Sequence, residues 1–126
     1  MQIYKTPLKE FKFLIEDFLK LDESKVLKKI DLETSDLMLI LDEAAKLCEE
    51  TLLPLNQSGD SEGCKFENGK VTAPSGFKDA YKVFSQNGWQ GLKVKEEFGG
   101  QNLPYIMNML LDEMISSTNM SFGLYP

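Results

Sequence analysis

The feature that most limits the fold of this chain is a long amphipathic segment in its first half. From Thr34 to about Asn56, apolar side chains recur every three or four residues, as they do along one face of an α-helix. The repeat is carried by Leu37, Leu41, Ala44, Cys48, Thr51 or Leu52, and Leu55. Pro54 removes a backbone donor near the end of this segment, so we expect the helix to bend or stop there. The segment therefore predicts an all-α bundle built around one long helix.

Two helical segments are predicted before it. Thr6 followed by Pro7 is typical of a helix start, because the hydroxyl caps the helix and proline presets its first dihedral angle. The apolar spacing predicts a buried helix from there to about Lys20, with side chains Leu8, Phe11, Phe13, Leu14, Ile15, Phe18 and Leu19. Asp22 is expected to cap a shorter helix over residues 23–29, exposed on most sides.

The centre of the chain has the features of a loop followed by a hairpin. Residues 57–63 are rich in glycine, serine and aspartate, which predicts a loop. Asn68-Gly69 is the pair favoured where both turn residues need a positive φ angle, so residues 64–73 are predicted to form a small β-hairpin.

Two more helices are predicted in the second half. Ser75 is expected to begin one, and Gly88 to end it as a left-handed cap. Its packed face would carry Phe77, Ala80, Tyr81 and Phe84. After an irregular stretch over residues 89–103, in which Trp89 is expected to pack between helices, Pro104 begins the final helix.

The charge balance and the missing histidine exclude several classes of function. The 126 residues carry 14 Lys+Arg against 20 Asp+Glu, a net charge of −6, and no histidine. An acidic chain repels phosphate backbones, so nucleic acid and anionic membranes are poor partners. Without imidazole, Ser-His-Asp and Cys-His catalysis and histidine metal sites are excluded. Cys48 and Cys64 lack redox or zinc spacing, and we expect both to be reduced.

The sequence shows no signal for a membrane. The first ten residues carry charges where a signal peptide needs an apolar stretch. The longest aliphatic run, residues 37–41, is too short to cross a bilayer. We therefore expect a soluble protein in the cytoplasm.

No motif supplies a catalytic, metal or cofactor site by itself. Adjacent carboxylates such as Glu49-Glu50 and Asp112-Glu113 point about 100° apart on a helix and do not converge on one substrate atom. A calcium loop beginning at Asp60 would need glycine and glutamate where other residues stand. The glycines at 88, 91, 99 and 100 lack the strand and lysine of a phosphate-binding loop. The methionines of the last helix are expected to be packing residues.

Several blocks taken in order resemble the amino-terminal helical domain of the acyl-CoA dehydrogenases. The likeness is strongest to the branch of 3-methylmercaptopropionyl-CoA dehydrogenase-like enzymes. The blocks are YKTPLKEFKF (4–13), LPLN (53–56), GD (59–60), GC (63–64), NGKV (68–71), PSGF (74–77), GWQGL (88–92) and EEFGGQNLP (96–104). Their order and spacing are more specific than any single block.

The resemblance implies a leader over residues 1–33 and an amino-terminal helical domain over residues 34–126. It implies further middle β and carboxy-terminal domains that this chain lacks. In that family the domains enclose FAD and an acyl-CoA thioester, and electrons pass to an acceptor. The resemblance assigns part of the acyl-tail wall to Asn119, Met120, Phe122 and Gly123. It assigns no catalytic or FAD-binding residue here, and Glu113 is expected to be an exposed or capping carboxylate. We expect the chain alone to be inactive and to hold no FAD.

Two alternatives remain open at this point. One is a stand-alone helical interaction module without redox activity, and the other is a small acyl-binding carrier. A further expectation concerns residues 107–125, whose apolar side chains exceed what one helical stripe hides. They are Met107, Met109, Leu110, Leu111, Met114, Ile115, Met120, Phe122, Leu124 and Tyr125. This face is expected to mediate self-association.

Overall fold

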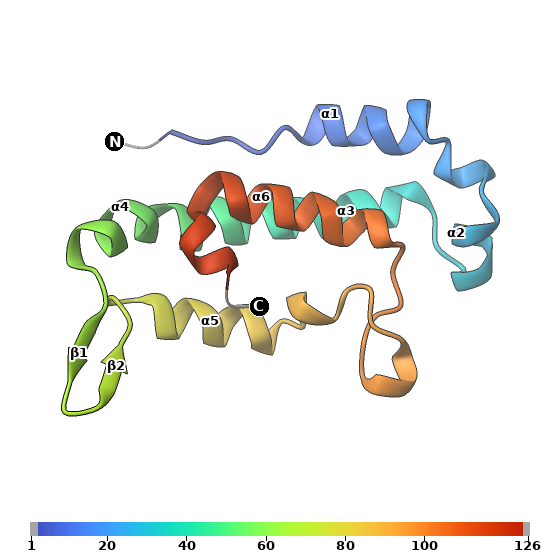
Figure 1. Ribbon diagram of the computed structural model, residues 1–126. Helices are drawn as coiled ribbons and strands as arrows, with labels where there is room; N and C mark the ends of the chain where they lie inside the picture. Colours follow the sequence, from blue (N-terminus) through green and yellow to red (C-terminus); the bar gives the residue numbers. More distant parts are fainter. Residues whose placement is uncertain (1–2, 125–126) are drawn as a thin grey trace.

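The computed structural model describes residues 3–124, and helices form most of its regular structure (Figure 1). The helices and helical turns are α1 (Leu8–Phe13), η1 (Leu14–Phe18), η2 (Leu21–Glu23), α2 (Lys25–Ile30), α3 (Thr34–Lys46), η3 (Leu47–Leu52), α4 (Leu53–Glu62), α5 (Phe77–Gln86), η4 (Trp89–Gly91), η5 (Glu96–Phe98) and α6 (Tyr105–Gly123). The strands are β1 (Lys65–Glu67) and β2 (Lys70–Thr72). The predicted all-α fold with one small hairpin is confirmed.

The core lies between the long helix and α6. The segments α3, η3 and α4 follow one another without a break and pack along α6, with α1 on one side of this pair and α5 on the other (Figure 1). Leu37, Leu41, Cys48 and Leu52 on the long helix are almost fully buried, as the periodicity predicted. Apolar burial against α6 therefore holds the bundle together.

Asp22 has a different role from the predicted one. Its carboxylate accepts hydrogen bonds from the Thr34 backbone N–H at 3.0 Å and from the Thr34 hydroxyl at 2.8 Å. The short helix α2 begins instead after Ser24. Asp22 thus satisfies donors at the start of the long helix, twelve positions further along the chain, because the chain between them folds back.

The predicted loop over residues 57–63 is wrong, because α4 continues to Glu62. The turn η3 is π-helical, and Pro54 then falls in the first turn of α4, where its missing donor is not needed. Gly59 packs directly on Phe77: a methyl group at Gly59 would lie 2.5 Å from the Phe77 ring. Packing on α5 therefore favours a helix in a segment whose composition favours a loop. Gly63, with φ 66°, ends it.

The hairpin and its turn at Asn68-Gly69 are confirmed. Phe66 pairs with Val71, and the turn residues Asn68 and Gly69 have φ angles of 50° and 76°. Both strands are exposed along their whole length. The hairpin projects from the end of the bundle (Figure 1).

The helix after the hairpin begins two residues later than predicted. The backbone and hydroxyl of Ser75 donate to the Glu62 carboxylate at 2.8 and 3.1 Å, and α5 starts at Phe77. Tyr81, expected on the packed face, is 47% exposed. Gly88 has the predicted left-handed conformation, with φ 75°.

The end of the irregular stretch that follows α5 is hydrogen-bonded to its beginning. The backbone N–H of Leu103 donates to the Leu92 oxygen at 2.7 Å, and that of Gln101 to the Gly91 oxygen at 2.9 Å. These bonds close the loop that connects α5 to α6. Trp89 is buried, as predicted.

The amino-terminal segment is attached to the long helix through Glu49. The Glu49 carboxylate accepts from Lys5 Nζ at 2.6 Å and from the Thr6 backbone N–H at 2.8 Å. Burial acts to raise the pKa of the Glu49 carboxyl, but these bonds outweigh it and hold that pKa below its usual range. Thr6 is not the helix cap that we predicted, because Pro7 occupies that position.

The first helix is buried on a narrower face than expected. Phe11 and Ile15 are buried, whereas Phe13 and Phe18 are 56% and 70% exposed. Leu19, also predicted to be part of the packed stripe, is 43% exposed.

No helix within residues 3–124 is long and apolar enough to cross a membrane. Those residues also bring together no group of His, Cys, Asp and Glu side chains that could hold a metal ion. Cys48 and Cys64 are both free, the first buried and the second exposed.

Candidate functional site

The candidate site lies where α6 loses its helical geometry. At Asn119 the backbone angles are φ −156° and ψ 83°, and the chain turns back toward α5 (Figure 1). The Asn119 Oδ1 accepts from the Phe122 backbone N–H at 3.0 Å and from the Ser121 hydroxyl at 2.8 Å. Its Nδ2 donates to the Leu52 oxygen at 3.1 Å. Asn119 therefore caps a new helical turn and ties it to η3.

The residue before the kink bonds back to the preceding turn of α6. The Thr118 hydroxyl lies within hydrogen-bond distance of the Met114 and Ile115 oxygens, at 2.8 and 3.2 Å. Such bonding back to the preceding turn often bends a helix. Cys48 lies nearby in the core, and burial raises the pKa of its thiol to about 12, although the Thr118 hydroxyl acts to lower it.

The structure divides the predicted acyl-wall residues between the core and the surface. Asn119 and Phe122 are almost fully buried, whereas Met120 is 63% exposed. The Phe122 ring packs edge-on against Phe84, with ring centroids 5.7 Å apart. A methyl group at Gly123 would lie 2.9 Å from Ile115, so glycine permits this close approach. The four residues thus do not share one exposed surface.

A shallow apolar groove borders this turn on the side of the hairpin. It has a volume of about 230 Å³ and is lined by Ala73, Phe77, Lys78, Tyr81 and Phe122. Phe77 and Phe122 are core residues, so one wall of the groove is fixed by the packing of α5 on α6.

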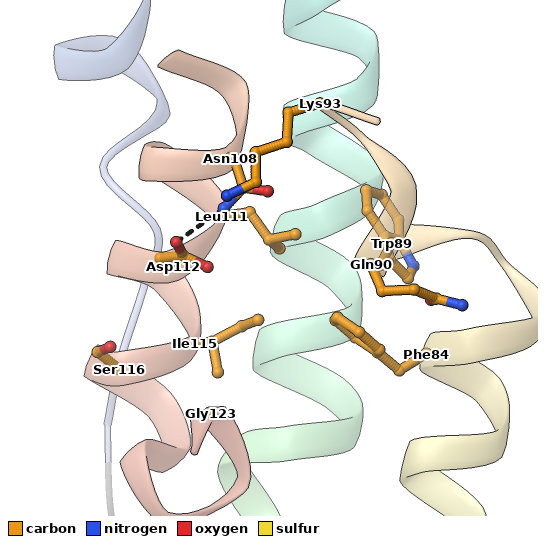
Figure 2. Close-up of a pocket in the computed structure, with 10 residues that line it drawn as sticks. All are labelled: Phe84, Trp89, Gln90, Lys93, Asn108, Leu111, Asp112, Ile115, Ser116 and Gly123. Atoms are coloured by element: carbon orange, nitrogen blue, oxygen red, sulfur yellow. Dashed lines mark hydrogen bonds between the residues drawn. The ribbon is translucent and has the colours of Figure 1, made fainter. Parts of the chain in front are cut away.

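A second pocket lies between α5, η4 and α6. It has a volume of about 260 Å³. Phe84, Trp89 and Gln90 line one side of it, and Leu111, Ile115 and Gly123 line the other (Figure 2). Lys93, Asn108, Asp112 and Ser116 complete the lining.

Most of the apolar side chains of α6 are buried within this chain, which corrects the expectation that residues 107–125 form an exposed apolar face. Met107, Leu110, Leu111, Met114, Ile115 and Phe122 are buried in the core of this chain. Of the same set, Met109, Met120 and Leu124 are 52%, 63% and 83% exposed, and Tyr125 lies outside the described residues. The neighbouring long helix and α5 cover most of the apolar surface of α6 that the periodicity had led us to expect at a contact with a partner.

Glu113 is exposed on α6, as expected. The site feature that sequence reasoning missed is the bond from Asn119 to Leu52, because a polar residue inside a helical pattern gives no sign of a distant backbone partner.

Comparisons with known proteins agree with the arrangement of these helices. The family described as "Acyl-CoA dehydrogenase, N-terminal domain" matches residues 34–126. The 3-methylmercaptopropionyl-CoA dehydrogenase of Ruegeria pomeroyi is 36% identical over 124 residues. That alignment covers 98% of this chain and 21% of the relative, so the chain spans about a fifth of the relative's length.

Proposed function

This chain belongs to the acyl-CoA dehydrogenase amino-terminal domain family, and from that premise we propose that it is the amino-terminal domain of a FAD-dependent acyl-CoA dehydrogenase. The observation that carries the proposal is the 36% identity, over 98% of the chain, to a relative named 3-methylmercaptopropionyl-CoA dehydrogenase. In this proposal residues 1–33 form a leader on the domain of residues 34–126. Middle β and carboxy-terminal domains would be supplied by the rest of the enzyme.

The proposed role of this domain is to form part of the wall around the acyl tail of an acyl-CoA thioester. Met120 is the exposed member of the four wall residues, and Gly123 keeps the turn close to Ile115. Asn119 and Phe122 would set the shape of the wall from within the core. The enzyme would act in fatty acid metabolism in the cytoplasm and pass electrons to a separate acceptor.

The two pockets beside α6 do not themselves fit FAD. One pocket is lined by apolar residues with Lys78 at its edge, and the other has Lys93 as its cation and Asp112 as an opposing carboxylate. Neither gathers the glycine-rich backbone donors that bind a diphosphate. FAD would therefore be held by the other domains, and no step of the reaction is assigned to this chain.

The test compares this chain with a longer protein that contains it. We expect the longer protein to reduce an electron-accepting dye in the presence of an acyl-CoA, and the 126-residue chain with added FAD to remain at the free-flavin background. A bulky Met120→Trp substitution should change the ratio of kcat/KM values between short and long acyl chains. Met109→Trp, at a similarly exposed methionine on the same helix, should leave that ratio unchanged.

Two results would contradict the proposal. Dye reduction by the 126-residue chain above the free-flavin background would show that the other domains are not needed. A longer protein without acyl-CoA-dependent turnover would favour the alternative, a helical interaction module without redox activity. That alternative is supported by the core, because the chain buries most of α6 by itself. Self-association stays a proposal, now restricted to the exposed Met109, Met120 and Leu124.

A further inference from the structure

The hairpin presents an apolar face to solvent. Phe66 and Val71 stand directly opposite each other on β1 and β2, so their side chains lie on the same face of the two-stranded ribbon. They are 72% and 70% exposed. Glu67 and Lys70, the neighbouring pair, lie on the opposite face because side chains alternate along a strand. The hairpin therefore has one apolar face and one polar face.

The apolar face leads to the groove beside α5. Ala73 follows β2 directly and lies two positions after Val71, the spacing that returns a side chain to the same face of a strand. Ala73 lines the groove of about 230 Å³, and the lining is almost entirely apolar. We call these residues together the hairpin–α5 surface: Phe66, Val71, Ala73, Phe77, Tyr81 and Phe122.

The hairpin lacks the packing that usually stabilises two strands. Each strand has three residues, all of them exposed, and the strands contact each other far more than any other element of the described chain. A two-stranded hairpin on its own is marginally stable in water and is stabilised when its apolar face packs against another element. Phe66 and Val71 contribute to stability only where such an element removes them from water.

The comparisons indicate where a covering element would come from. The chain matches a domain family, and the alignment spans 21% of the Ruegeria relative, so most of that relative lies outside it. Domains of one polypeptide commonly share an interface. Phe122, one of the proposed acyl-wall residues, lines the groove, so the hairpin–α5 surface is continuous with the proposed wall.

We propose that the hairpin–α5 surface is covered by a further domain of the same polypeptide, which presents an apolar patch to Phe66 and Val71 and fills the groove. This inference rests on the proposed function, because it takes the chain to be one domain of a longer enzyme. It adds which end of the bundle meets the rest of that enzyme, namely the end from which the hairpin projects (Figure 1). The covering domain contacts Phe122 from outside, while Phe84 packs on it from within.

The test compares hydrogen–deuterium exchange, followed by mass spectrometry, in the 126-residue chain and in a longer protein that contains it. We expect the backbone amides of residues 65–72 to exchange at least about tenfold more slowly in the longer protein, because covering the hairpin suppresses its local opening. In that protein Phe66→Ser should remove most of the difference. The matched control is Glu67→Ser, the next residue of β1 on the opposite face, which should keep the slow exchange.

The outcomes separate this inference from the proposed function. Equal exchange of the hairpin in the two proteins would contradict the inference even if the longer protein reduces the dye with acyl-CoA. Slow exchange in a longer protein without turnover would support the covered surface and contradict only the proposed function. Two further results would overturn the inference: equal effects of Phe66→Ser and Glu67→Ser, or protection that appears in the 126-residue chain as its concentration rises, which would place a second copy on the surface.

Discussion

The side-chain amide of Asn119 donates a hydrogen bond to the main-chain oxygen of Leu52 at 3.1 Å, across 67 positions of the chain. Leu52 is the last residue of the π-helical turn, and Asn119 is the residue at which α6 departs from helical angles. One bond therefore joins the irregular points of the two central helices. Asn119 is buried, so this bond supplies its Nδ2 donor with an acceptor that solvent would otherwise provide.

Replacing Asn119 by alanine should destabilise the protein. The change removes the bond to the Leu52 oxygen and leaves the Phe122 N–H without its buried acceptor, so we expect the free energy of unfolding to fall by about 2–3 kcal/mol. Urea denaturation followed by circular dichroism measures this. Met120→Ala, at the exposed next residue, should change the stability by less than about 0.5 kcal/mol. Equal stability of the two variants would mean that Asn119 does not hold the turn.

Gly59→Ala tests the contact that keeps residues 57–62 helical. Alanine favours a helix over glycine by about 1 kcal/mol, but its methyl group would lie 2.5 Å from the buried Phe77 ring. We expect the clash to dominate, with a net loss of about 1–2 kcal/mol and a lower Tm in thermal unfolding. Ser58→Ala, at the exposed preceding position, should leave the Tm within a few degrees of the wild-type value.

Adding Phe77→Leu to Gly59→Ala should recover part of the lost Tm, because the smaller side chain makes room for the methyl group. No recovery would indicate that the clash is relieved elsewhere and that Gly59 does not direct α4 onto α5.

The sequence predicted those elements whose cause is local. The periodicity of Leu37, Leu41 and Cys48 predicts one buried face, and Asn68-Gly69 predicts its turn, since each depends only on neighbours in the chain. The helix over residues 57–62 depends on Phe77, which no local pattern reveals. Composition alone therefore gave the wrong result for that segment.

The burial of the candidate site residues could not be predicted from the sequence, for the same reason. The resemblance indicated Asn119, Met120, Phe122 and Gly123. It could not show that Asn119 and Phe122 are buried while Met120 is exposed to solvent. That division follows from the kink at Asn119, which depends on the distant Leu52 oxygen. A prediction that continues the regular helix through Asn119 would therefore misplace the side chains that follow it.

The two cysteines should differ sharply in reactivity. Burial raises the pKa of Cys48 to about 12, whereas Cys64 is exposed. Iodoacetamide reacts with the thiolate, so near pH 8 we expect alkylation of Cys64 and protection of Cys48 in the native protein. Peptide mass spectrometry after a short exposure identifies the modified residue, and unfolded protein should be modified at both.

The raised pKa of Cys48 also predicts a loss of stability in alkaline solution. Between the ordinary thiol pKa of about 8.5 and the native value of about 12, the unfolded chain loses the Cys48 proton while the native chain keeps it. The free energy of unfolding should therefore fall as the pH rises through this range. Cys48→Ala should show a smaller fall than the wild type when urea denaturation is compared near pH 7 and near pH 10. Equal falls would contradict a buried, protonated thiol.

Met114 distinguishes a core residue of this chain from a residue that meets a partner. Its side chain is fully buried among the central helices, so Met114→Asp places an unpaired carboxylate in the core. We expect a loss of at least about 3–4 kcal/mol, seen as a large drop in the urea midpoint or as loss of the folded state. Met109→Asp, at a 52% exposed position of the same helix, should keep nearly the wild-type stability. Sedimentation velocity separates the two explanations of the apolar residues of α6. If the wild type is a dimer and the Met114→Asp variant is a folded monomer, Met114 lies in an interface between chains. That result would contradict its position in the core.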